Sequence, residues 1–170
     1  MKWYTIHKGK HRSGLYVKPH YNKHELTYDV TFTDTCRYTL NTTDQFDINK
    51  LFGLSYGFHH HNSVRFGWRN LKESSNKIEI LAYCYIDGIR LRERGTNIFI
   101  GFVDTNKTYT FSIKTTNKSY ILSVDDKYSK VNTKEIDHNK LPKWGYHLYP
   151  YFGGNCPAPH DINIFMEKIG

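Results

Sequence analysis

One segment near the C-terminus constrains the fold most: residues 149–166, where an aromatic, glycine- and proline-rich loop runs directly into an alternating strand. Gly153 and Gly154 permit a positive φ or a close approach of two backbones, and Pro157 and Pro159 stiffen the loop. After the loop, apolar side chains occupy every second position, which is the pattern of a strand that buries one face. We therefore expect this segment to close a β-sandwich, with the aromatic head of the loop facing a groove.

Alternating segments recur through the rest of the chain and predict further antiparallel strands. Three hairpins are expected, joining 51–58 to 64–69, 78–86 to 89–92 across the Asp87-Gly88 turn, and 109–113 to 120–124. An Asp-Gly pair favours the type I′ turn that matches the twist of its strands. Residues 36–40 predict a short strand, 98–103 a strand covered on both faces, and 125–141 a long polar loop or one helical turn.

The composition supports the same fold class, because 14 Tyr and 10 Phe stand beside only two alanines and aromatic residues favour strands. A chain of 170 residues fits one domain that can bury a core without disulfides or metals. We expect an all-β protein with a single antiparallel two-sheet β-sandwich of the jelly-roll type. Residues 1–27 are expected to form a basic N-terminal arm and first strand, and residues 28–170 the sandwich domain.

The three cysteines, Cys36, Cys84 and Cys156, are odd in number and widely spaced. Free thiols, with Cys84 buried in a strand, are the simplest interpretation, and no metal-ligand spacing accompanies them. The start of the chain lacks the apolar run of a signal peptide, and no stretch approaches the length of a transmembrane helix. We therefore expect a protein of the cytoplasm or of a virion, with no membrane contact, no cofactor and no metal.

The net charge of +8 is concentrated at the N-terminus, where residues 1–24 carry six Lys or Arg and no acid. Such an arm can contact an acidic protein surface, an anionic polymer or nucleic acid, or can simply keep the protein soluble. Nucleic-acid binding is the weaker interpretation, because stacking platforms usually mix aromatic and basic residues on one sheet. The candidate partner-contact residues are Lys8, Lys10, Arg12, Lys18 and Lys23.

The order of several segments resembles the concanavalin A-like superfamily of lectins and glucanases, at the level of pattern. The segments are 47–53, 64–69, 78–90, 151–154 and 160–164. The resemblance implies a concave sheet that binds glycans in lectins and forms a catalytic cleft in glycoside hydrolases and polysaccharide lyases. Similar jelly rolls also occur in virion proteins, so the fold alone does not decide the function.

The catalytic strings of those enzymes are missing from this sequence. A retaining glycosidase needs two close carboxylates, which the family places as Glu-x-Asp-x-x-Glu on one strand, whereas Glu79 stands alone on its strand. A jelly-roll polysaccharide lyase would use Arg, His and Tyr on the concave face. Residues such as His59, Arg65 and Tyr83 could supply these groups, but the motifs Arg-Ser-Glu-x-Arg and Gln-x-His are absent. We assign no catalytic residue and keep the lyase as the alternative function.

A glycan surface needs aromatic faces for sugar rings and polar groups for hydroxyls. Alternation places Trp68 on the buried face of its strand and its polar neighbours on the opposite face. The run His59–His61 is not expected to bind a metal, because consecutive residues of an extended chain point to opposite faces. The candidate ligand-binding residues are Arg65, Arg69, Tyr83, Tyr85, Trp144, Tyr149 and Tyr151.

Together these observations favour a non-enzymatic jelly-roll module for binding or assembly. The abundance of Lys, Asn, Ile and Tyr is typical of AT-rich genomes such as those of many bacteriophages. We therefore expect a bacteriophage virion structural protein, as capsid decoration or attachment module, that could also bind glycans. Its expected partners are other proteins of the assembly or a glycan, and its oligomeric state is left open.

Overall fold

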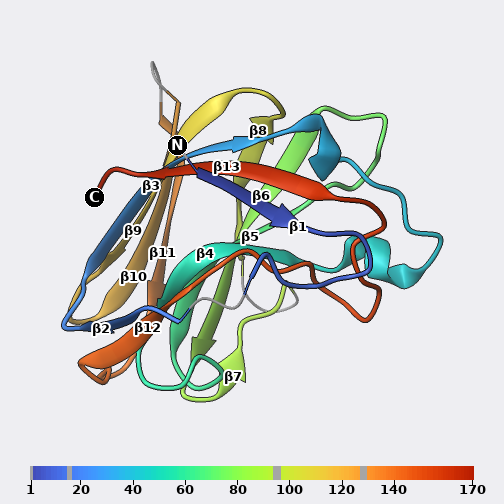
Figure 1. Ribbon diagram of the computed structural model, residues 1–170. Helices are drawn as coiled ribbons and strands as arrows, with labels where there is room; N and C mark the ends of the chain where they lie inside the picture. Colours follow the sequence, from blue (N-terminus) through green and yellow to red (C-terminus); the bar gives the residue numbers. More distant parts are fainter. Residues whose placement is uncertain (1, 15–16, 94–96, 127–129) are drawn as a thin grey trace.

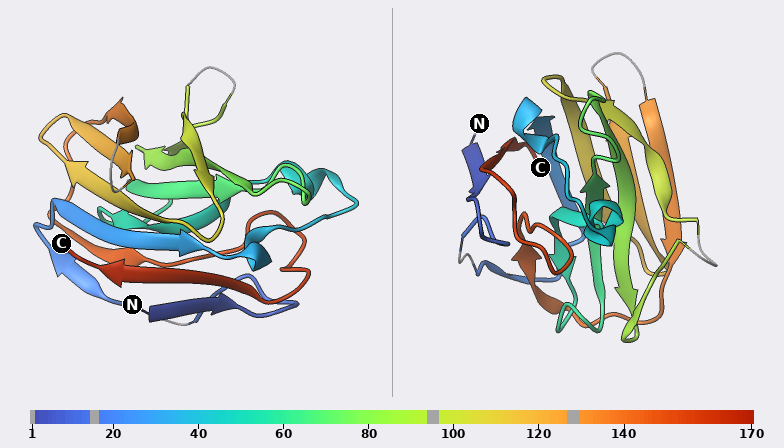
Figure 2. Two further views of the ribbon diagram at one scale, coloured as in Figure 1. Left: turned by 90° about the horizontal axis from the view of Figure 1, so that it is seen from above. Right: turned by 90° about the vertical axis from the view of Figure 1, so that its right-hand side faces the viewer.

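Two antiparallel sheets packed face to face form the protein (Figure 1), and the two layers are seen from the side in Figure 2. The computed structural model describes residues 2–14, 17–93, 97–126 and 130–170. The all-β, two-sheet sandwich expected from the sequence is confirmed. No helix among the described residues has the length and apolar character needed to cross a membrane.

Within the described residues, six strands form the first sheet and seven form the second. In spatial order, the first sheet contains β1 (Lys2–Ile6), β13 (Ile162–Lys168), β3 (Glu25–Phe32), β9 (Thr108–Thr115), β10 (Ser119–Asp125) and β11 (Lys130–Asp137). The second contains β2 (Pro19–Tyr21), β12 (Trp144–Leu148), β4 (Asn49–Ser55), β5 (Ser63–Arg69), β6 (Lys77–Ile86) and β7 (Ile89–Arg90), with β8 (Phe99–Asp104) also paired to β6. Two short 3₁₀ turns, η1 (Asp34–Cys36) and η2 (Thr43–Phe46), lie between β3 and β4.

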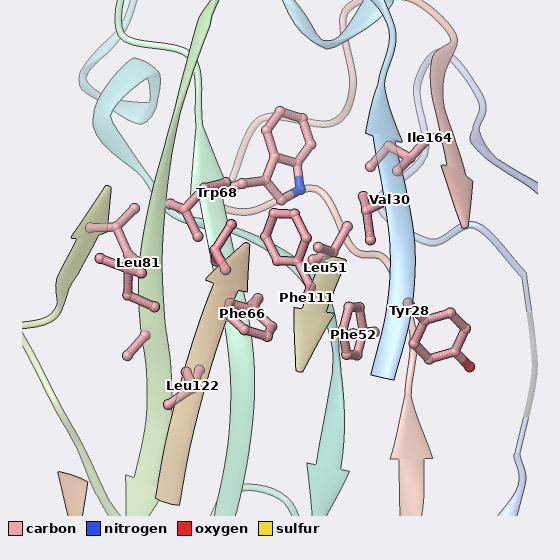
Figure 3. Close-up of a cluster of buried hydrophobic side chains, with 14 of the residues drawn as sticks. Tyr28, Val30, Leu51, Phe52, Phe66, Trp68, Leu81, Phe111, Leu122 and Ile164 are labelled. Carbon is pink, nitrogen blue, oxygen red and sulfur yellow. The ribbon is translucent and has the colours of Figure 1, made fainter. Parts of the chain in front are cut away.

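The core lies between the sheets and contains many aromatic rings (Figure 3). Phe66 and Trp68 of β5 are fully buried. The Phe66 ring lies 5.0 Å from Phe111 of β9, and the Trp68 ring lies 5.4 Å from Phe32 of β3, between centroids. Such contacts bury large apolar areas and join the two layers. The same alternation turns Arg65 of β5 to the outward face of the second sheet.

The three predicted hairpins are confirmed. β4 pairs with β5, and β9 pairs with β10. β6 turns into β7 through Asp87 and Gly88, whose φ angles of 49° and 82° are both left-handed, as a type I′ turn requires. The terminal strand β13 buries alternate residues and pairs with β1 and β3, which places the two ends of the chain side by side (Figure 1).

Two predictions about the edges of the sheets are wrong. β8 forms, but it is not covered on both faces, because Phe99 and Phe102 remain 38% and 48% exposed. Residues 130–137 form the strand β11, paired with β10, instead of a loop or a helical turn. A polar sequence suits a strand at a sheet edge, where one face meets solvent. Residues 127–129 of the same prediction lie outside the described residues.

The short strand expected at 36–40 is also wrong. The chain turns at η1 instead, because the Thr33 hydroxyl accepts a hydrogen bond from the backbone N–H of Thr35 at 3.3 Å and caps the turn. The segment that follows is held by a side chain, since the Leu40 N–H donates to Gln45 Oε1 at 2.6 Å. Local side-chain bonds of this kind compete with the strand ladder.

The N-terminal residues contribute a strand to each sheet, because β1 pairs with β13 and β2 pairs with β12. Between these strands, Arg12 forms an isolated β-bridge with Tyr151. The expected boundary between residues 27 and 28 falls inside β3. The basic segment therefore crosses from the first sheet to the rim of the second.

Candidate functional site

A hollow lies on the outward face of the second sheet, where side chains of β4, β5, β6 and β12 meet residues of three loops. Its volume is about 640 Å³, within the usual range of ligand sites. Its polar and aromatic wall consists of Arg12, Lys50, His59, His60, Arg65, Tyr83, Tyr85, Tyr146, His147, Tyr149 and Tyr151. None of the described residues that line this hollow is acidic, so it has a net positive charge. We call it the groove.

Arg65 lies at the floor of the groove and is only 9% exposed. Its Nη2 donates to the carbonyl oxygen of Tyr149 at 2.7 Å, whereas its buried Nε has no hydrogen-bond partner. No acidic side chain among the described residues forms an ion pair with it. Burial lowers the pKa of the guanidinium to about 10, so it remains a cation at neutral pH. A buried cation without a counterion is costly and is suited to an anionic ligand.

A glycine on the neighbouring strand makes room for this side chain. Gly53 of β4 pairs with Arg65 of β5. A Cβ at Gly53 would overlap the Val64 carbonyl and lie 2.6 Å from Arg65 Cγ. The absence of a side chain therefore lets the Arg65 stem lie close against β4.

Lys50 and Tyr83 face each other across the groove floor. The Lys50 ammonium lies 4.9 Å from the centre of the Tyr83 ring and 5.3 Å from that of Tyr151, distances at which a cation is attracted to an aromatic face. Burial lowers the pKa of the Lys50 ammonium. Burial alone would raise the pKa of the Tyr83 phenol, but the positive charges of Lys50, Arg90 and Arg65 outweigh it and lower that pKa below its ordinary value.

Tyr146 and His59 form a hydrogen-bonded pair at one end of the groove. The Tyr146 hydroxyl accepts from the His59 backbone N–H at 3.2 Å and lies 2.6 Å from His59 Nδ1. Desolvation by burial, aided by His60 and the neighbouring arginines, lowers the pKa of His59 to about 4. The ring is therefore neutral at pH 7, and its Nδ1 can accept a hydrogen bond from the Tyr146 hydroxyl.

The C-terminal loop forms one wall of the groove. The Asp44 carboxylate accepts from the backbone N–H groups of Asn155 and Cys156 at 2.8 and 2.6 Å. At the other end of the loop, the backbones of Lys50 and Tyr151 exchange hydrogen bonds of 2.8 and 2.9 Å. These bonds hold Tyr149 and Tyr151 over the sheet, as the aromatic head of this segment suggested.

The structure brings five of the seven candidate ligand-binding residues into the groove: Arg65, Tyr83, Tyr85, Tyr149 and Tyr151. Arg69 lines an adjoining hollow of about 300 Å³ that shares Lys50, Tyr83 and Gly154 with the groove. Its guanidinium contacts Glu79 at 2.5 Å and Glu93 at 2.6 Å, so its charge is already neutralised. Trp144 lines neither hollow.

Most of the basic candidate residues of the N-terminal segment lie outside the groove. Of the five candidate partner-contact residues, only Arg12 lines the groove.

Sequence reasoning omitted Lys50 and Arg90 from the candidate ligand residues. The β4–β5 register places Lys50 opposite Gly67 on the outward face, but it depends on an irregularity of β4 between residues 50 and 53 that alternation along the sequence does not reveal. Arg90 follows the turn after β6, and its Nη1 reaches Tyr83 Oη at 3.4 Å.

The histidine run does not assemble a metal site in the part of the chain that the structure describes, where no three metal-binding side chains converge. His59 bonds to Tyr146, whereas His61 Nδ1 lies 2.9 Å from the side-chain nitrogen of Asn62. The ring nitrogens of these two histidines are thus engaged by separate partners.

No protein-family model and no curated protein matches the sequence, but solved structures match the fold. The alginate lyase from Klebsiella pneumoniae superposes with a TM-score of 0.55 at 10% identity, covering 85% of this chain and 58% of the lyase. The chain thus spans less than two thirds of that enzyme. The Crh5 transglycosylase in complex with NAG superposes with a TM-score of 0.51 at 9% identity, covering 98% of this chain and 70% of the transglycosylase.

At such low identity these likenesses show the fold alone. Both neighbours are named for activities on carbohydrates, and the expected place in a bacteriophage particle finds no support among them. The likenesses therefore agree with the two-sheet β-sandwich of this chain.

Proposed function

We propose that the protein binds an anionic polysaccharide, such as a polyuronate, along the outward face of its second sheet. The observation that carries this proposal is Arg65, a buried cation with no acidic partner among the described residues and one guanidinium nitrogen left without a hydrogen bond. A carboxylate placed in the groove would neutralise that charge and accept a charge-assisted hydrogen bond from the guanidinium.

The other walls of the groove suit the rest of such a polymer. Arg12 and Lys50 add positive charge, and the tyrosines offer faces for sugar rings. The adjoining hollow that shares Lys50 and Tyr83 extends the groove beyond one sugar residue. The Klebsiella neighbour acts on alginate, which is a polyuronate, and this agrees with the proposal without testing it.

Calorimetric titration with polymers of different charge tests the proposal. Alginate and polygalacturonate are expected to bind, and neutral laminarin is not. Arg65→Met should weaken binding by about 10- to 100-fold, the effect of losing a charged hydrogen bond. Arg37→Met is the matched control, because Arg37 pairs with Asp34 at 3.5 Å and lines neither hollow. Equal binding of laminarin, or an unchanged affinity in Arg65→Met, would contradict the proposal.

A second candidate function, cleavage of the polyuronate by β-elimination, is favoured by the lowered pKa of Tyr83. Arg65 would pair with the uronate carboxylate and acidify the adjacent C–H. A deprotonated Tyr83 oxygen would accept that proton as the electron pair forms a C=C bond and the glycosidic C–O bond breaks. The departing oxygen would take a proton from a nearby hydroxyl such as that of Tyr146.

Ultraviolet absorbance of the unsaturated product separates cleavage from binding. Cleavage should be abolished in Tyr83→Phe, and its rate should rise with pH as the Tyr83 phenol deprotonates. Bound alginate and polygalacturonate that yield no absorbance would leave a binding protein without lyase activity.

The expected virion role rests on composition and on the absence of a catalytic motif, and the same is true of protein partners in a capsid. Binding of a polysaccharide by an attachment module would be compatible with that role. Mass spectrometry of purified virions is the direct test, and absence of the protein from such particles would contradict it.

A further inference from the structure

The groove does not account for three large aromatic side chains exposed beside it. Tyr21, Phe58 and Trp144 are 74%, 72% and 48% exposed. Tyr21 and Trp144 are direct cross-strand partners on β2 and β12, and the Phe58 ring stands edge-on to the Trp144 indole at 5.5 Å between centroids. We call these three side chains the aromatic platform. A cluster of exposed apolar groups usually marks a binding surface.

The platform continues the groove along the same face of the sheet. Trp144 and Tyr146 stand two residues apart on β12, so they share a face at a spacing of about 7 Å. Phe58 immediately precedes His59, whose ring lies 5.9 Å from that of Tyr146. The same loop and the same strand therefore supply two successive ring pairs, of which the His59 and Tyr146 pair lines the groove.

We propose that the aromatic platform is an outer subsite that stacks against a sugar ring of the polysaccharide chain whose other residues occupy the groove. This inference rests on the proposed function. Aromatic faces pack against apolar ring faces of a sugar, and the platform and the His59–Tyr146 pair follow one another along the same face of the sheet. Two polar residues border the platform, because Asn22 follows Tyr21 and Lys143 precedes Trp144. The Asn22 backbone N–H donates to the Lys143 carbonyl oxygen at 2.6 Å and holds the two residues together.

An outer subsite makes affinity depend on chain length. A short uronate oligomer fills the groove alone, whereas a longer oligomer also reaches the platform. Calorimetric titration with a series of oligogalacturonates of increasing length should show a gain in affinity once the platform is reached. Trp144→Ala should remove that gain, weakening the long oligomers about tenfold, the effect expected for one aromatic contact, and leaving the short ones unchanged.

The chain offers a matched control in Trp3, which is 53% exposed on β1 of the first sheet and packs against Phe165. Trp3→Ala should bind all oligomers like the wild type. Trp144→Phe, which keeps an aromatic face, should restore part of the length-dependent gain. Circular dichroism establishes that each variant is folded.

The outcomes separate this inference from the proposed function. If the wild type binds no uronate oligomer, the proposed function fails and the outer subsite fails with it. If the wild type and Trp144→Ala show the same gain with length, or if Trp144→Ala weakens short and long oligomers equally, the outer subsite is wrong while the groove proposal stands. If the wild type self-associates and Trp144→Ala does not, while the affinities for oligomers of each length are unchanged, the platform is a protein contact and the inference is overturned.

Discussion

The outward faces of the two sheets differ in the partners that their polar side chains find. On the first sheet, the Thr110 hydroxyl donates to Asp29 at 2.7 Å, and Thr31 and Thr108 share a hydrogen bond of 2.7 Å across the same pair of strands. On the second sheet, Arg65 is buried without an acidic partner among the described residues. These polar groups of the first face have partners within the sheet, whereas the second face keeps one buried cation without an acidic partner among the described residues.

Alternation along a strand decides which residues face outward but not which groups they contact there. On the first face, short hydroxyl and carboxylate side chains find cross-strand partners. On the second face, three loops bury long cationic and aromatic side chains without supplying a counterion. The energetic cost of that burial is what the proposed uronate carboxylate would offset.

Gly53→Ala is expected to have the largest effect, because it removes the space in which Arg65 lies. The added methyl group would overlap the Val64 carbonyl and lie 2.6 Å from Arg65 Cγ. Overpacking should lower the free energy of unfolding by about 3 kcal/mol, and the displaced guanidinium should no longer bind uronate. Urea denaturation and calorimetric titration measure the two effects. A variant as stable as the wild type, with full affinity, would show that the close approach is not required.

Arg65→Met makes the second face resemble the first in one respect, because it removes the buried cation that has no acidic partner among the described residues. Removing a buried cation should raise the free energy of unfolding by about 1 kcal/mol or more, while uronate binding weakens by about 10- to 100-fold. Thermal and urea unfolding at neutral pH provide the measurement. A destabilised variant would mean that the hydrogen bond to the Tyr149 carbonyl outweighs the cost of burying the charge.

Two histidines of the second face should make the stability of the fold depend on pH. Burial lowers the pKa values of His59 and His147 to about 4, below the ordinary value of 6.5. The unfolded chain therefore binds these protons at a higher pH than the folded protein, and stability should fall as the pH decreases from about 6.5 to 4. Solvent screening keeps the effect of each ring below the ~1.4 kcal/mol per pH unit of one full proton.

His59→Gln, which retains a hydrogen-bond acceptor for Tyr146, should flatten this decline, as measured by urea denaturation across the same pH range. His24→Gln, at an exposed position, is the control and should leave the decline unchanged. An equally steep decline in both variants would assign the effect to other groups.

The sequence predicted the sheets and the direction of many side chains, because both follow from a period of two. The two-residue alternation along each strand predicted that Trp68 points inward and that Arg65 and Tyr83 point outward, and the structure agrees. Parity could not predict that Lys50 enters the groove, since β4 is irregular between residues 50 and 53.

Contacts between elements that are distant in the sequence could not be predicted from the alternation of residues along one strand. Arg69 lies on the same face of β5 as Arg65, four residues further along the strand. Its charge is nevertheless neutralised by Glu79 on β6 and by Glu93 beyond β7. Trp144 is exposed as a ligand residue should be, but it lies outside the groove because its strand position is two residues before Tyr146. The polar strand β11 escaped prediction because an edge strand needs no apolar alternation to form.

Thr110→Val is expected to have the smallest effect and tests the first face directly. The substitution keeps the shape of the side chain and removes one hydroxyl that donates to the half-exposed Asp29. Because water can replace the lost partner, the free energy of unfolding should fall by about 1 kcal/mol or less, and the affinity for uronate should not change. Calorimetric titration and urea denaturation of Thr110→Val beside Arg65→Met measure both quantities under one set of conditions. If Thr110→Val weakens uronate binding as strongly as Arg65→Met, the ligand does not distinguish the two faces, and the buried charge of Arg65 cannot be the reason for binding.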